Sequence, residues 1–241
     1  MPAGVNGRPL VDEPVVEVTL DHLAEQWQNG VFDAALWGDL YFGGGRQDFQ
    51  ILQNKGSRIR RLIAGPTAGD QTILYGKNDW QRRSGDAGGE VSGYDETGAA
   101  AHLVLEFEAV VGSSSVFDND VFFAGLAAAP TDGRTSDNIA GWILVGDELN
   151  VVTDFVGVET VTPITPVPNL NITHHYRMLC IDGAIYFFID HLAVAGHRTN
   201  LDNAVVIPVW NAANAPAESA LFSVTNISIG YKRYTERFLV V

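Results

Sequence analysis

The sequence predicts an all-β protein, built as a two-sheet antiparallel jelly-roll sandwich. From residue 48 onward, about a dozen short segments rich in β-branched and aromatic residues follow one another, separated by Gly, Pro, Asn and Asp. No alternation of a strand with a long helix appears, which argues against a βαβ architecture. The chain has 241 residues, of which 46% are apolar, so one large domain can build its own hydrophobic core.

Composition excludes several classes of protein. The 15 basic and 29 acidic residues give a net charge of −14, which argues against a nucleic acid as the partner. No run of about 18 apolar residues is present, so no membrane span is expected. The first residues lack the pattern of a secretory signal. The single cysteine, Cys180, lies in an apolar run and is expected to be an inert core thiol.

The chain is expected to begin with an N-terminal arm and one short helix. Residues 1–14 are rich in Gly, Pro and Asn and indicate an arm, which leaves residues 15–241 as a single domain. A helix is predicted between Thr19 and Gly30, because Thr19 or Asp21 offers an N-cap and Gly30 a stop. Apolar residues follow at helical spacing, at Leu20, Leu23 and Trp27.

The rest of the chain is expected to form strands. The predicted strands cover residues 48–53, 59–63, 71–75, 103–110, 121–126, 141–145, 149–153, 176–181, 184–189, 205–210 and 221–229. Asp182-Gly183 between two apolar runs is a strong hairpin signal. Asp190-His191 is a second predicted tight turn, because Asp and His tolerate a positive φ better than most residues.

Several pieces occur in a recognisable order between Ala99 and Tyr234. They are an extended strand at Leu103–Val111, the sequence Phe123–Ala127 with the polar loop Pro130–Asn138, the segment Thr173–Gly183, the hairpin Ala184–Val194 and the closing Asn226–Arg233. In this order they resemble the concanavalin A-like (LamG-like) jelly roll, in the version found in virion proteins of tailed bacteriophages. The chain departs from that pattern at His191, where the family usually has Gly.

Because glycoside hydrolases share this fold, paired carboxylates are the first chemistry to look for. Glu106 and Glu108 are two residues apart on a predicted strand, so they share one face. The catalytic strand of the family carries a third acid, which is missing here. We therefore expect Glu106 and Glu108 to belong to a solvated face and the chain not to be an enzyme.

Two further sets of residues are candidates for binding. An exposed aromatic platform for a glycan could come from Trp80, Trp142 and Trp210, although each is more simply explained as a core residue. Asp118, Asn119 and Asp120 place three oxygen-bearing side chains in one loop, where calcium could bind, but Asp and Asn are also common turn formers. No other cofactor is indicated.

The resemblance implies a non-enzymatic structural protein of a bacteriophage particle, such as a capsid decoration, a head fibre or a tail-associated subunit. Its expected partners are other virion proteins and copies of itself, and its expected location is the virion, assembled in the host cytoplasm. The alternative is a lectin-like carbohydrate-binding module that recognises host-surface glycans. The two hypotheses are compatible, and a glycoside hydrolase is the third.

Overall fold

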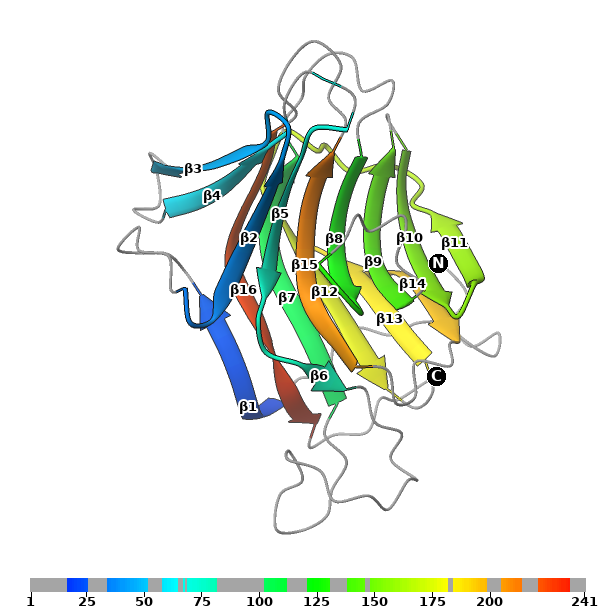
Figure 1. Cartoon of the computed structure of the whole chain (residues 1–241). Coiled ribbons are helices and arrows are strands. Elements are labelled where there is room, and N and C mark those ends of the chain that lie inside the picture. The colour runs from blue at the N-terminus through cyan, green and yellow to red at the C-terminus, as the bar shows by residue number, and fades with distance from the viewer. Residues whose placement is uncertain are drawn as a thin grey trace.

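The computed structural model is an all-β sandwich of two antiparallel sheets (Figure 1), which confirms the predicted fold class. The residues that it describes are 17–25, 34–51, 58–64, 67, 69–81, 102–111, 121–130, 138–145, 148–181, 184–198, 205–213 and 221–234. Among them, no helix is long and apolar enough to cross a membrane.

Each sheet has eight strands. We call sheet I the one with the order β14-β13-β12-β7-β16-β4-β3, in which β1 pairs with β16. Its strands are β1 (Glu17–Glu25), β3 (Arg46–Ile51), β4 (Arg58–Ile63), β7 (His102–Val111), β12 (His174–Ile181), β13 (Ala184–Ile189), β14 (Leu192–Arg198) and β16 (Leu221–Tyr234).

Sheet II has the order β11-β10-β9-β8-β15-β5-β2, and β6 pairs with β15. Its strands are β2 (Trp37–Phe42), β5 (Gln71–Gly76), β6 (Trp80–Gln81), β8 (Val121–Ala127), β9 (Asn138–Val145), β10 (Glu148–Phe155), β11 (Val158–Pro163) and β15 (Val205–Ala213). Strands from the N-terminal third of the chain therefore lie in both sheets, beside strands from its C-terminal part.

The core lies between the sheets and is dominated by aromatic rings. Phe107 on β7 of sheet I meets Trp142 on β9 and Trp210 on β15 of sheet II edge to face, with ring centres 5.5 Å apart in both pairs. Such pairs contribute about 0.5–1.5 kcal/mol each beyond the area that they bury. Cys180 is buried in the same core, which confirms its predicted place.

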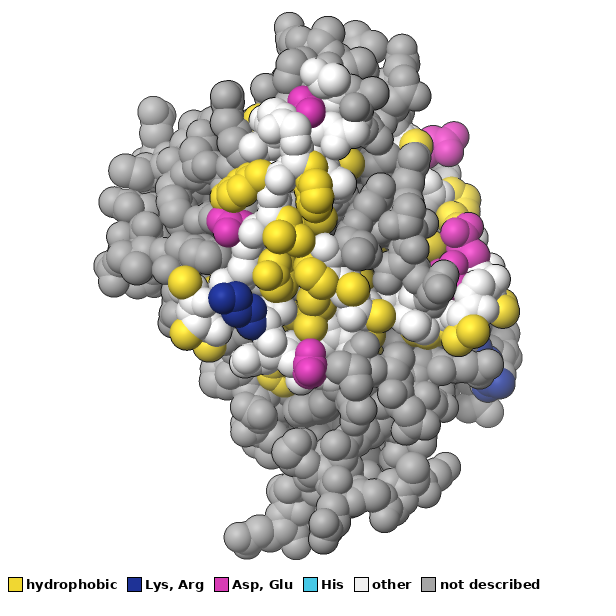
Figure 2. Space-filling view, in the orientation of Figure 1, with side chains coloured by type: hydrophobic (Ala, Val, Ile, Leu, Met, Phe, Trp, Pro, Cys, Tyr) yellow, Lys and Arg dark blue, Asp and Glu magenta, His cyan; other side chains and the backbone are white. Residues whose placement is uncertain are grey.

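The outer face of sheet II is apolar as well. Ile73, Phe123 and Val209 point away from the main core, yet all are fully buried and form a second cluster. Figure 2 shows hydrophobic side chains gathered over the middle of this sheet. The outer face of sheet I is mixed, because it carries a smaller buried apolar cluster, Val104, Leu179 and Phe188, beside the half-buried Glu106 and Glu108.

The predicted helix between Thr19 and Gly30 is wrong. Its described part belongs to β1, which pairs with β16 from Glu17↔Tyr234 to Glu25↔Ile227, with a bulge between Thr19 and Asp21. The long β16 offers backbone partners to the whole segment, and this tertiary pairing outweighs a local helical spacing of three apolar residues.

The two predicted tight turns have different outcomes. Asp190 and His191 have φ values of 49° and 66° and connect β13 to β14, which confirms this turn. Asp182-Gly183 lies outside the described residues. The predicted arm, residues 1–14, lies outside them too, so the division into an arm and a single domain stays a prediction.

Candidate functional site

The candidate site lies on the outer face of sheet I, where β7 presents two carboxylates. Strand alternation turns Leu105 and Phe107 into the core, where each is at most 1% exposed. Glu106 and Glu108 therefore point to the opposite face and are half-buried there. The expectation that the two carboxylates share a face agrees with this arrangement.

The neighbours of the two carboxylates come from the flanking strands. The register places Arg177 of β12 and Ser228 of β16 opposite Glu106. His175 of β12 lies opposite Glu108. Directly opposite residues in an antiparallel pair lie within contact distance, so three strands build one polar patch.

Glu106 is held by an ion pair. Arg177 Nε lies 3.2 Å from Glu106 Oε1, and the two side chains are 5% and 19% exposed. A guanidinium that is so deeply buried needs a matched charge, because removing it from water is costly. The pair therefore restricts the orientation of Glu106.

Glu108 is held by an amide that a β-bulge aims at it. The register of β16 against β7 shifts between Thr225 and Ser228, and Asn226 within the bulge has a φ of 50°. Its Nδ2 donates to Glu108 Oε2 at 2.7 Å. Asn is among the few residues that adopt this backbone conformation readily, and bulges commonly redirect a side chain beside a functional site.

Two histidines at the start of β12 lie beside the turn between β13 and β14: His175 is on the face of the patch, opposite Glu108, whereas His174 is buried opposite Ala109. His174 contacts Asp190 Oδ2 through Nδ1 at 2.6 Å and the carbonyl oxygen of Asn169 through Nε2 at 2.8 Å. Both partners carry acceptor oxygens, so the two ring nitrogens are held from opposite sides. The rings of His175 and His191 stack with centres 4.9 Å apart, which places an imidazole pair at the rim beside Glu108.

The groups around Asp190, the carboxylate in this turn, change its pKa. Burial alone would raise the pKa of Asp190, but hydrogen bonds from the His174 ring and the His175 N–H, with the charges of both histidines, lower this pKa below its ordinary value. The His175 N–H donates to Asp190 Oδ1 at 2.9 Å. Asp190 therefore remains ionised and fixes the start of β12 against the turn.

The three tryptophans that the sequence offers as a glycan platform lie in the core. Trp80, Trp142 and Trp210 are 5%, 2% and 0% exposed and belong to the main cluster. A buried ring cannot stack on a sugar at the surface, so the structure places them away from any such platform. The possible calcium ligands Asp118, Asn119 and Asp120 lie outside the described residues, and that site stays a prediction.

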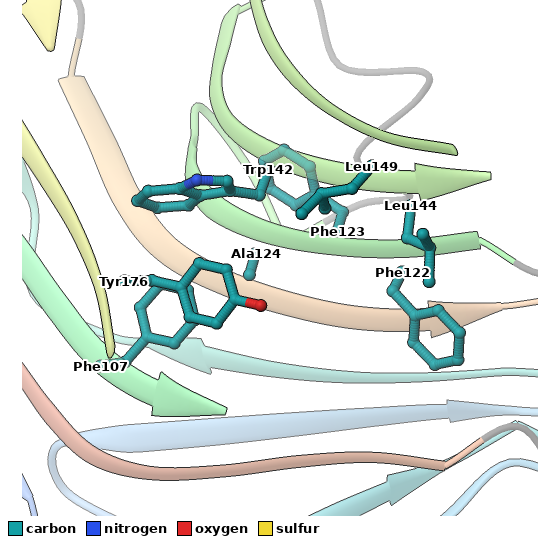
Figure 3. A pocket seen from close by; sticks show the side chains of 8 residues that line it. All are labelled: Phe107, Phe122, Phe123, Ala124, Trp142, Leu144, Leu149 and Tyr176. Atoms are coloured by element: carbon teal, nitrogen blue, oxygen red, sulfur yellow. The ribbon is translucent and has the colours of Figure 1, made fainter. Parts of the chain in front are cut away.

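A small cavity lies beside Trp142 (Figure 3). It measures about 20 Å³ and is lined by Phe107, Phe122, Phe123, Ala124, Trp142, Leu144, Leu149 and Tyr176. This volume is close to that of one water probe, and its walls are apolar. Burial raises the pKa of the Tyr176 phenol well above its ordinary value, so this hydroxyl stays protonated. The cavity is too small for a sugar and belongs to the core.

No protein-family model and no curated protein matches this sequence. Solved structures do match its fold. A protein of unknown function from Shewanella oneidensis MR-1 has a TM-score of 0.60 and 9% identity, covering 90% of this chain and 88% of that one. The β-glucanase of Bacillus licheniformis has a TM-score of 0.56 and 13% identity, covering 90% and 98%.

Other matches have the same character. A family 16 glycoside hydrolase of Bacteroides ovatus, from a mixed-linkage glucan locus, has a TM-score of 0.59 and 8% identity, covering 87% of this chain and 99% of that one. The family 7 alginate lyase of Zobellia galactanivorans has a TM-score of 0.52 and 10% identity, covering 83% and 96%. The chain therefore has the concanavalin A-like jelly-roll fold.

These matches correct one prediction. The chain was expected not to be an enzyme, but most of the named matches are enzymes that act on glycans, with the fold shared over most of this chain. The prediction rested on a missing third acid on one strand, whereas a site on this sheet draws its side chains from three strands. Nothing in these matches points to a phage particle, so the virion location and virion partners stay predictions.

From the sequence, Glu106 and Glu108 were placed on one face but expected only to be solvated, and the residues that hold them were missed. Arg177 could have been found by pairing the predicted strand 176–181 with 103–110, although the register is not visible in the sequence, whereas His175 lies just before that predicted strand. Asn226 gives no such signal, because a bulge depends on the pairing of its strand with two neighbours.

Proposed function

We propose that this protein binds a neutral polysaccharide on the outer face of sheet I, around Glu106 and Glu108. The observation that carries the proposal is the preorganised carboxylate pair, fixed by Arg177 on one side and by the bulged Asn226 on the other. Ionised carboxylates accept hydrogen bonds from sugar hydroxyls, and the amide can serve as both donor and acceptor.

The charge of the molecule favours a neutral ligand over an anionic one. The net charge is −14, and the patch itself places two carboxylates on neighbouring positions of one face. A polyuronate such as alginate would meet repulsion there, since like charges brought together oppose binding. The fold is shared with β-glucanases and with alginate lyases alike, so the charge is what favours the glucan-like ligand.

A second candidate activity is hydrolysis of the bound glycan, and the spacing of the carboxylates favours it. Two residues along a strand advance by roughly 7 Å, which is near the separation that glycosidases use for an acid and a base. Glu108, which accepts a hydrogen bond from the Asn226 amide, would serve as the general acid or base. Glu106, paired with Arg177, would be the second carboxylate.

The test is binding to soluble mixed-linkage β-glucan and to alginate, measured by isothermal titration and affinity electrophoresis. We expect the glucan to bind and the alginate not to. Asn226→Gly should weaken binding at least tenfold while the fold is retained, because Gly accepts a positive φ but has no amide. Glu148→Gln, an exposed change at the start of β10, is the control away from the patch.

Hydrolysis is followed by the release of reducing ends. Release that is lost in Glu108→Gln, with binding kept, would establish the enzymatic activity. Absence of binding to every neutral glycan on an array, by a folded protein, would overturn the proposal. The virion hypothesis is tested separately, by immunogold labelling of phage particles with an antibody against this chain.

A further inference from the structure

Strand β11 forms one edge of sheet II and is almost entirely exposed. Eight large apolar side chains of the described residues are exposed, and six of them lie between Val156 and Leu192. The largest fractions belong to the β10–β11 hairpin, with Val156 at 84% and Val158 at 72%, and Val161 on β11 is 47% exposed. Figure 2 shows hydrophobic and acidic side chains along this rim.

The hydrogen-bonding groups on the free side of β11 can be assigned from the register. The hairpin has a two-residue turn, Val156-Gly157, between the paired residues Phe155 and Val158. Such turns close on a hydrogen-bonded pair, so Val158, Thr160 and Thr162 bond to β10. Glu159 and Val161, which alternate with them, direct their N–H and C=O groups outward.

This edge has little protection against pairing. Proteins usually block an edge with a bulge, with lysines or with a proline in mid-strand. The pairing of β11 with β10 is regular over its whole length, its one charged residue is Glu159, and Pro163 is at its end. The edge strand of sheet I at the same side, β14, has a register shift against β13 and ends in Arg198.

We propose that β11 pairs antiparallel with β11 of a second copy of this chain, around a two-fold axis at Thr160. This register places Glu159 opposite Val161 twice, so the outward N–H and C=O groups of both residues are satisfied in both copies. No like charges face each other, because each Glu159 meets a valine. Val158 then faces Thr162, which covers an exposed valine.

The hairpin tip supports the same conclusion. Val156 has a φ of 54° and Gly157 a φ of 78°, and the valine is the most exposed large apolar residue described. A β-branched residue is a genuine outlier in this conformation, where Asn or Gly is usual. The proposed pairing brings the tip beside the end of β11 in the second copy, where the side chain of Val156 can be buried against that copy.

The test is sedimentation velocity of the full chain at several concentrations, from about 1 µM to about 100 µM. We expect a concentration-dependent dimer. Val161→Lys, which puts a charge on the edge, should weaken dimerisation at least tenfold. Val167→Lys is the matched control, because Val167 is similarly exposed, at 41%, but lies in the loop after β11. Circular dichroism checks that both variants keep the fold.

A monomer at every concentration, or equal effects of the two lysine substitutions, would overturn the proposal. Assemblies larger than a dimer would also overturn the two-fold arrangement, because they require pairing of β11 with a different edge. The measurement does not depend on glycan binding, so the two proposals can fail separately. Glu108→Gln should leave the sedimentation profile unchanged.

Discussion

The ion pair between Arg177 and Glu106 can be tested by removing each partner in turn. In Glu106→Gln the guanidinium loses its counter-charge although its side chain is only 5% exposed. Breaking a buried pair in this way costs about 3–5 kcal/mol of unfolding free energy. Glu106 is 19% exposed, so water offsets part of the loss, and we expect about 3 kcal/mol.

The double variant Glu106→Gln/Arg177→Met separates this cost from ordinary loss of packing. With both charges gone, neither partner is left as a buried charge without its counter-ion, so the double variant should lose less stability than the sum of the two single losses predicts. We expect a coupling energy of about 2 kcal/mol or more, measured as a double-mutant cycle by urea unfolding. Additive effects, or a loss below about 1 kcal/mol in Glu106→Gln, would refute the interpretation of a tightly held buried pair.

Three further predictions concern pH and backbone strain. His197 lies between Thr153 Oγ1 at 3.0 Å and Thr162 Oγ1 at 2.9 Å, and burial lowers its pKa. The free energy of unfolding should therefore fall as the pH drops below about 6.5, because the unfolded chain then binds a proton that the folded protein does not. His197→Gln should remove this slope. The pKa of Asp190 is lowered in the folded protein, so its ionised carboxylate stabilises the fold fully above about pH 3.9 and progressively less below it. The difference in unfolding free energy between the protein and Asp190→Asn should therefore shrink below that pH, and a difference that stays constant with pH would contradict this prediction. Val156→Asn should raise stability by about 1 kcal/mol in thermal melts at low protein concentration, because Asn suits a positive φ; an unchanged midpoint would show that Val156 is not strained.

Much of the fold could be predicted because apolar residues repeat at strand spacing. The Asp190-His191 turn was visible in two residues, since the chemistry of a tight turn is local. The helix predicted from Thr19 failed for the opposite reason. Its fate was decided by β16, some two hundred residues further along the chain, which no local pattern reports.

The site was only half visible for the same reason. Alternation along β7 alone places Glu106 and Glu108 on one face, so sequence reasoning found them. Their partners, Arg177 and Asn226, come from two other strands and depend on register. The tryptophans show a different limit: the core was the simpler interpretation of each, and only the burial of the ring decides between a core and a sugar platform.

The bulge at Asn226 links the core to the site. Before the bulge, Val224 of β16 faces the core, opposite Ala109 of β7. After the bulge, Ile227 and Ile229 face the core, and Ile229 lies opposite Leu105. Without one extra residue, the second half of β16 would turn its isoleucines to the outer face, because a shift of one residue exchanges the two faces of a strand. The core therefore requires an inserted residue here, but it does not require an amide. A glycine would satisfy the backbone, whereas asparagine also reaches Glu108. The choice of asparagine is thus explained by the outer face, which is where we place the ligand.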